Sequence, residues 1–119
     1  MLTLPSSIRV YLAIDPVDMR GSFDALAGGV RRLGLDPLDG HLYVFFNRRR
    51  SLMKLLFFDR TGWSIFAKRL ELGSFQLPTV PEGQQRLAID GTTLAMILEG
   101  IDLTRAPRRK RYALPTAAK

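Results

Sequence analysis

Residues 41–70 have the sequence HLYVFFNRRRSLMKLLFFDRTGWSIFAKRL, which is the most informative stretch about the fold. It contains three runs rich in apolar and aromatic residues, at 41–46, 52–58 and 63–70, and two short polar segments separate them. Apolar runs of this length between turn residues are typical of strands joined as hairpins. The stretch therefore predicts an antiparallel meander of three strands.

The first two runs of this meander are apolar on both faces of the predicted strands. The third run alternates, and Trp63, Ile65 and Ala67 share one of its faces. An antiparallel sheet in a small domain usually leaves one face to water. We therefore expect cover by helices on both faces or by a second subunit, and a homo-oligomer is one of the expected partners.

Further short strands are predicted on either side of the meander. Residues 8–14 form a weakly alternating apolar stretch that stops at Asp15-Pro16, and residues 86–89 form a brief extended stretch. Residues 73–76 are predicted to add a short edge strand.

Two helices are predicted from apolar spacing and capping residues. Asp18 is expected to cap the first helix, whose apolar positions recur at helical spacing from Phe23 to Leu33 before Gly34 ends it. Asp90 or Thr92 is expected to cap a second, short helix that Gly100 closes.

The predicted fold is therefore α+β, with a four- to five-stranded antiparallel sheet, two helices and a basic C-terminal tail. A chain of 119 residues corresponds to one domain, which we place at residues 1–103. Residues 104–119 contain six basic residues, two prolines and only two large apolar residues. We expect this tail to be disordered because it has little apolar surface to bury.

The net charge of +7 is concentrated in two segments. Residues 101–119 carry six basic residues and one acidic residue, and residues 48–60 carry five basic residues and one acidic residue, so the rest of the chain is slightly negative. Concentrated positive charge attracts polyanions, and nucleic acid is the obvious one. The alternative is that both segments are ordinary solvated turns and termini.

The turn at Arg48, Arg49 and Arg50 is the stronger candidate for DNA contact, because guanidinium groups bind phosphate oxygens in pairs. Lys54 and Lys68 would extend this positive surface if their strands turn them to one side. The predicted DNA-binding residues are Arg48, Arg49, Arg50, Lys54, Lys68, Arg69, Arg105, Arg108, Arg109, Lys110 and Arg111.

The inventory of catalytic side chains is small. The chain has no cysteine and one histidine, His41, at a strand start where a structural role is the commoner one. We find no phosphate-binding glycine loop, no zinc motif of paired histidines and no nucleophile elbow. We therefore expect no catalytic residue, no metal site and no cofactor.

An Mg²⁺-dependent nuclease is the alternative from the enzyme class, because such enzymes hold the metal with two or three carboxylates. The candidate carboxylates are those of Asp15, Asp18, Asp59 and Glu71. Capping, turn and surface positions account for all four, so we favour structural roles for them.

The longest apolar runs have five residues, at 42–46 and 94–98, against about 20 for a membrane-spanning helix. We therefore expect no membrane association. The absence of cysteine is consistent with a reducing compartment, and we expect a cytoplasmic location.

An ordered set of short motifs runs through almost the whole chain. It comprises Leu-Pro-Ser at 4–6, Arg-Val-Tyr-Leu-Ala at 9–13, Asp-Met-Arg at 18–20, Phe-Asp-Ala-Leu at 23–26, Gly-His-Leu-Tyr-Val-Phe at 40–45, Asn-Arg-Arg-Arg at 47–50, Leu-Leu-Phe-Phe-Asp at 55–59, Lys-Arg-Leu-Glu at 68–71 and Leu-Glu-Gly-Ile-Asp at 98–102. In this order the motifs resemble TnpB, the accessory protein from the second open reading frame of the insertion-sequence-sixty-six family of bacterial transposable elements.

The chain departs from the family pattern at Ser51, where an acidic residue is frequent, at Phe57 and Phe58, where tryptophans are frequent, and at Ala67, where an aromatic residue is frequent. The resemblance implies a role in DNA transposition beside a separate, larger transposase. We predict a non-catalytic accessory protein that binds DNA, the partner transposase or both. A protein-only adaptor without DNA contact is the alternative from the interaction class.

Overall fold

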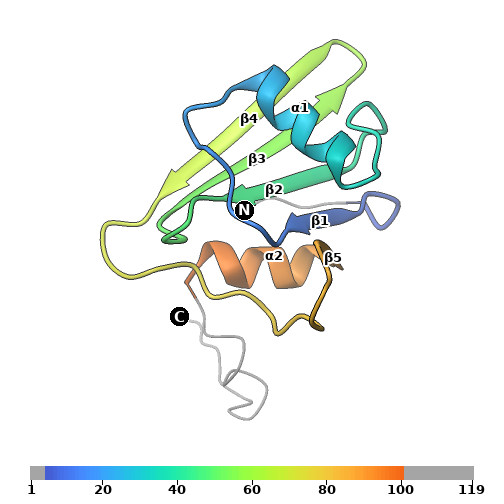
Figure 1. Ribbon diagram of the computed structural model, residues 1–119. Helices are drawn as coiled ribbons and strands as arrows, with labels where there is room; N and C mark the ends of the chain where they lie inside the picture. Colours follow the sequence, from blue (N-terminus) through green and yellow to red (C-terminus); the bar gives the residue numbers. More distant parts are fainter. Residues whose placement is uncertain (1–4, 101–119) are drawn as a thin grey trace.

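A computed structural model of the chain describes residues 5–100. It contains five strands and two helices in the order β1, α1, β2, β3, β4, β5, α2 (Figure 1). Their bounds are Val10–Ala13 for β1, Phe23–Arg32 for α1, Leu42–Phe46 for β2, Leu52–Asp59 for β3, Gly62–Arg69 for β4, Arg86–Ile89 for β5 and Gly91–Leu98 for α2.

The strands form one sheet in the order β4-β3-β2-β1-β5. The predicted meander is confirmed, since β2 pairs antiparallel with β3 and β3 with β4 along all eight residues of β4. The α+β class with two helices is confirmed as well, and the sheet is mostly antiparallel. Residues 101–119 lie outside the described part of the chain, and with them the predicted tail and its boundary at residue 104.

The pair β1–β2 is parallel, which the sequence patterns did not indicate. The connection explains it, because α1 lies between these two strands in the chain and a helical crossover returns the chain to the end of the sheet at which β1 began. The strand at the sheet centre, β2, is buried at all five residues.

Two hydrophobic clusters lie on opposite faces of the sheet, because alternate residues of β2 belong to different clusters. On one face, Tyr43 and Phe45 pack with residues of α1, including Val30. On the other, Leu42, Val44 and Phe46 pack with Leu94 and Ile97 of α2. The prediction of cover on both faces is therefore met by the chain's own helices.

The two helices begin differently. Of the two predicted caps, Asp90 and Thr92, it is Asp90 that caps α2, with its carboxylate accepting the backbone N–H of Thr93 at 2.8 Å. The expectation that Asp18 caps α1 is wrong, because the residue before that helix is Ser22, which makes no side-chain capping bond. The carboxylate of Asp18 instead binds the guanidinium of Arg20.

The predicted edge strand at 73–76 does not form; this segment is an irregular loop. Its aromatic residue, Phe75, is nevertheless buried and packs on Phe46, with ring centroids 5.7 Å apart. The loop thus anchors beneath the end of β2, where the arginine-bearing turn begins.

Candidate nucleic-acid interface

The turn between β2 and β3, residues 47–51, is held by the side chain of Asn47. Its amide oxygen accepts the backbone N–H groups of Ser51 at 2.9 Å and Leu52 at 3.1 Å, and its amide nitrogen donates to the hydroxyl of Ser51 at 3.1 Å. The backbone closes the same turn, because Arg50 donates to the carbonyl of Asn47 at 3.0 Å. One asparagine therefore fixes both ends of the turn.

The loop after β4 braces the turn from its other side. The N–H of Phe75 donates to the carbonyl of Arg50 at 2.7 Å, and that of Leu70 donates to the carbonyl of Ser51 at 2.8 Å. Arg50 adopts a left-handed conformation, with φ of 55°, which a non-glycine residue holds only where its surroundings fix it. The turn is therefore a rigid frame for its arginines.

Arg48 and Arg49 are exposed on this frame, and Arg50 is half-buried. Arg69 joins them from β4, since the register places it opposite Leu52, the first residue of β3 after the turn. We call these four residues, Arg48, Arg49, Arg50 and Arg69, the arginine cluster. Within residues 5–100 none of the four forms an ion pair with a carboxylate.

The two lysines predicted to belong to the same surface are separated by the sheet. Lys54 lies on the α1 face, where its ammonium group donates to the carbonyls of Met19 at 2.6 Å and Gly21 at 3.0 Å. Lys68 lies on the α2 face and donates to the carbonyl of Leu98 at 2.6 Å. The expectation that both extend one positive surface is not met, because each ammonium group secures a backbone segment beside a helix.

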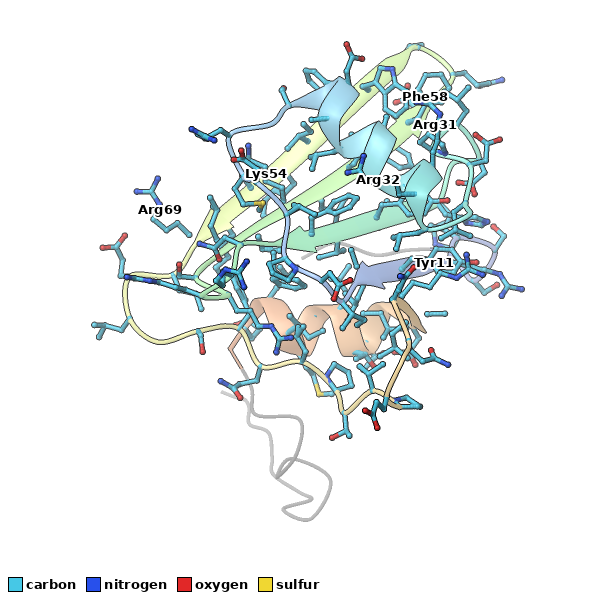
Figure 2. The ribbon with its side chains drawn as sticks, viewed as in Figure 1. Tyr11, Arg31, Arg32, Lys54, Phe58 and Arg69 are labelled. Atoms are coloured by element: carbon cyan, nitrogen blue, oxygen red, sulfur yellow. The ribbon has the colours of Figure 1, made fainter. Side chains whose placement is uncertain are left out.

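Figure 2 shows how the labelled cations are distributed. Arg69 lies at one side of the molecule, Lys54 lies over the segment that leads into α1, and Arg31 and Arg32 lie on α1 away from Arg69. Both arginines of α1 are exposed and belong to its last turn, where positive charge favours the helix dipole. Arg86 has a comparable role, donating to the carbonyl of Leu33 after α1.

The remaining candidate positions, Arg105, Arg108, Arg109, Lys110 and Arg111, lie outside the described residues. The chain leaves the described part at Gly100, two residues after the carbonyl of Leu98 that Lys68 binds. Lys68 is the neighbour of Arg69 on β4. Helix α2 therefore ends near the end of β4 that carries Arg69, although the side chain of Arg69 lies on the opposite face of the sheet.

Two of the four candidate carboxylates, those of Asp18 and Asp59, have structural partners. The ion pair with Arg20, at 2.8 Å, lowers the pKa of Asp18 to about 2. The carboxylate of Asp59 accepts the hydroxyl of Thr61 and the backbone N–H groups of the same turn, which lowers its pKa. Among residues 5–100 no group of three or more histidine and acidic side chains is placed to hold a metal ion.

The polar cluster around His41 is structural in the same sense. The Nδ1 atom of His41 accepts the backbone N–H of Arg9 at 3.0 Å, which links the starts of β1 and β2. The buried hydroxyl of Tyr43 donates to the carboxylate of Asp39, and burial together with this carboxylate raises the pKa of the tyrosine. Both side chains connect elements of the fold.

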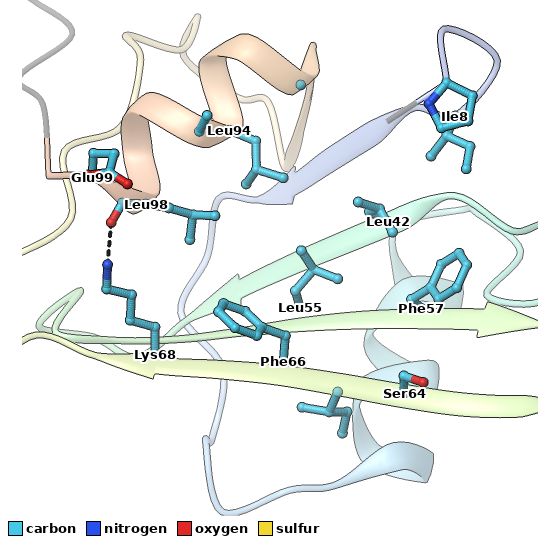
Figure 3. A pocket seen from close by; sticks show the side chains of 14 residues that line it. Ile8, Leu42, Leu55, Phe57, Ser64, Phe66, Lys68, Leu94, Leu98 and Glu99 are labelled. Atoms are coloured by element: carbon cyan, nitrogen blue, oxygen red, sulfur yellow. Dashed lines mark hydrogen bonds between the residues drawn. The ribbon is translucent and has the colours of Figure 1, made fainter. Parts of the chain in front are cut away.

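An apolar groove lies on the α2 face, between that helix and strands β3 and β4 (Figure 3). Its volume is about 670 Å³. Leu55, Phe57 and Phe66 contribute from the strands, and Leu94 and Leu98 contribute from the helix.

Across the described residues, no helix has the length and hydrophobicity that a membrane crossing requires.

A known protein family matches most of this chain. The family model described as IS66 Orf2 like protein matches residues 8–108. The chain therefore belongs to the IS66 Orf2-like family, the accessory proteins of this class of transposable element.

Two proteins of Sinorhizobium fredii (strain NBRC 101917 / NGR234) are similar over nearly their whole length. Uncharacterized protein y4hO is 41% identical over 103 residues, which cover 86% of this chain and 88% of the relative. Uncharacterized protein y4jC is 30% identical over 110 residues, 92% of each. No solved structure gives a significant match.

Sequence reasoning selected Arg48 to Arg50 from composition, but it missed the role of Asn47. An asparagine at the end of a predicted strand is a signal for a turn closed by its own side chain. Sequence reasoning also could not separate Arg69 from Lys68, which differ only in the face that the strand gives them.

Proposed function

We propose that this chain is a non-catalytic accessory protein of DNA transposition that binds DNA phosphates through the arginine cluster. The observation that carries the proposal is the exposure of Arg48 and Arg49 on a turn fixed by Asn47 and by the loop that contains Phe75. A fixed turn has already lost the conformational entropy that binding would otherwise cost. Guanidinium groups presented in this way bind phosphate oxygens of any sequence.

The basic segment after Gly100 adds to the same interface in this proposal. A chain covers at most about 3.5 Å per residue, so Arg105 lies within about 18 Å of Gly100. Because α2 ends beside β4, this reach is sufficient to add the charges of residues 105–111 to those of the arginine cluster. The DNA contact then combines a rigid element with a segment of high positive charge.

The decisive experiment measures the salt dependence of binding to a DNA duplex. Each phosphate contact contributes about −0.9 to the slope of log affinity against log salt. We expect the double variant Arg48→Gln/Arg49→Gln to flatten the slope by about 1.8 and to weaken binding about 60-fold near 0.1 M salt. The variant should unfold at the same urea concentration as the parent chain.

The chain supplies a matched control. Arg31→Gln/Arg32→Gln removes the same charge from two exposed positions on α1 that lie away from Arg69 (Figure 2). We expect this control to retain most of the slope. Equal slopes for the two double variants would show that only net charge matters and would reject the arginine cluster as the interface.

A second candidate function is that of an adaptor that binds its transposase without touching DNA. The apolar groove beside α2 favours it, because an open groove lined by leucine and phenylalanine side chains fits an apolar segment of another protein. Co-purification of the transposase from nuclease-treated extract, abolished by Leu98→Lys and retained by the arginine double variant, would support the adaptor. Loss of the transposase on nuclease treatment would contradict it.

A further inference from the structure

Strand β4 forms one edge of the sheet (Figure 1). Its inner side pairs with β3, and no other described strand pairs with its outer side, so half of its backbone N–H and C=O groups have no strand partner. Natural edge strands are usually protected by charges, prolines, bulges or short length. In β4 the five central residues, 63–67, include neither a charge nor a proline.

The opposite edge is protected by comparison. Strand β5 has four residues and begins with the charged Arg86. Strand β4 has eight residues and carries Phe66, which is 53% exposed. A long edge strand with an uncharged central stretch and an exposed aromatic side chain is suited to pairing with another strand.

We propose that β4 pairs antiparallel with β4 of a second copy of this chain, across a two-fold axis that passes at Phe66. A symmetric dimer uses the same surface on both subunits, so each β4 supplies the partner that the other lacks. With the axis at Phe66, the two phenylalanine rings lie side by side, Ala67 faces Ile65 of the second copy, and Arg69 faces Trp63 of the second copy. The exposed rings thereby cover each other.

The distribution of charge selects this register and direction. A parallel pair in register would bring Lys68 and Arg69 beside the same cations of the second copy. The antiparallel pair separates the two Arg69 residues by six strand positions, about 20 Å. It also brings Glu71, which follows β4, towards Arg60 in the turn that precedes the second copy's β4.

Two neighbouring registers also place the α1 faces of both copies on the same side of the combined sheet, but they are less favourable. An axis at Ile65 would direct Asp59 towards Glu71 of the second copy, which are like charges. An axis at Ala67 would place Lys68 opposite Phe66, so the aromatic rings would no longer face each other. Pairing at Phe66 is the arrangement in which apolar groups face apolar groups and like charges stay apart.

The test measures the mass of the full chain in solution by sedimentation or light scattering. We expect twice the chain mass of 13.4 kDa. Phe66→Lys and Phe66→Glu should each give the single-chain mass, because the substituted residue faces itself across the axis. An equal mixture of the two variants should restore the double mass, since opposite charges then face each other.

Leu38→Lys is the matched control, because Leu38 is 50% exposed and lies between α1 and β2, outside β4. It should retain the double mass, and circular dichroism should show all variants folded. The proposal fails if the parent chain keeps the single mass from micromolar to millimolar concentration, if Phe66→Lys remains double, or if the mixture does not recover. It is independent of DNA binding, because the Arg48→Gln/Arg49→Gln variant should keep the double mass.

Discussion

The arginine cluster and the two strand lysines carry the same charge but have different roles. Arg48 and Arg49 extend from a turn into solvent, and within residues 5–100 no carboxylate pairs with them. Lys54 and Lys68 are half-buried, and their ammonium groups bind backbone carbonyls beside α1 and α2. A basic residue on a strand face that a helix covers can therefore stabilise the fold by binding backbone carbonyls, and its charge alone does not indicate a ligand.

The largest effect that would disrupt this comparison is expected from Asn47→Ala, which changes no charge. The variant loses three hydrogen bonds of the turn and should lower the free energy of unfolding by about 2–3 kcal/mol. It should also weaken DNA binding, because the turn would no longer hold Arg48 and Arg49 in place. Urea unfolding and duplex titration of the same preparation measure both effects.

Ser51→Ala is the control for Asn47→Ala. It removes only the bond to the hydroxyl and keeps the two backbone bonds to the asparagine oxygen. We expect a loss of about 1 kcal/mol and unchanged DNA affinity. If Asn47→Ala binds DNA as tightly as the parent chain does, the rigidity of the turn has no part in recognition.

The next largest effect tests whether Lys54 stabilises the fold or binds DNA. Lys54→Met keeps the length of the apolar stem but leaves the carbonyls of Met19 and Gly21 without their donor. We expect a loss of about 2 kcal/mol in unfolding free energy, measured by urea unfolding, and no change in the salt slope of DNA binding.

Lys68→Met is the companion variant on the other face. Its ammonium group has one carbonyl partner, that of Leu98, so the expected loss is smaller, about 1 kcal/mol. A reduced salt slope in either lysine variant would return that residue to the DNA interface and would contradict the structural role.

The sequence was sufficient for the meander and for the start of α2 near Asp90, because periodicity and capping are local properties. It also indicated that both sheet faces are covered, but it left open whether helices or a second subunit cover them. It was insufficient for the pairing of β1 with β2, which depends on where a helical crossover returns the chain. The capping role expected of Asp18 failed for a local reason: Arg20, two residues away, binds its carboxylate.

The candidate site was predictable in part. Composition identified Arg48 to Arg50, because three consecutive arginines in a predicted turn are exposed in most folds. The roles of Lys54 and Lys68 could not be predicted, since they depend on which face α1 and α2 cover and on the carbonyls that meet each ammonium group. These are tertiary contacts between residues at least 30 positions apart.

The smallest effect extends the comparison of exposed and structural charge to an acid. Hydrogen bonds from Thr93 lower the pKa of Asp90 below its ordinary value of 3.8. A lowered pKa in the folded state means that the carboxylate stabilises the fold above that ordinary value, and that the stabilisation is lost as the pH falls through the lowered value. Asp90→Ala should therefore cost about 1 kcal/mol at neutral pH.

The same variant should cost less as the solution is acidified below pH 3.8, because the parent chain then loses its charged cap as well. Asp90→Asn is the control, since asparagine caps helices about as well as aspartate without titrating. Urea unfolding of the three proteins across this range measures the difference. A cost that stays constant through the acid range would show that the charge of Asp90 contributes nothing to the cap, and that its oxygen acts only as a neutral acceptor for Thr93.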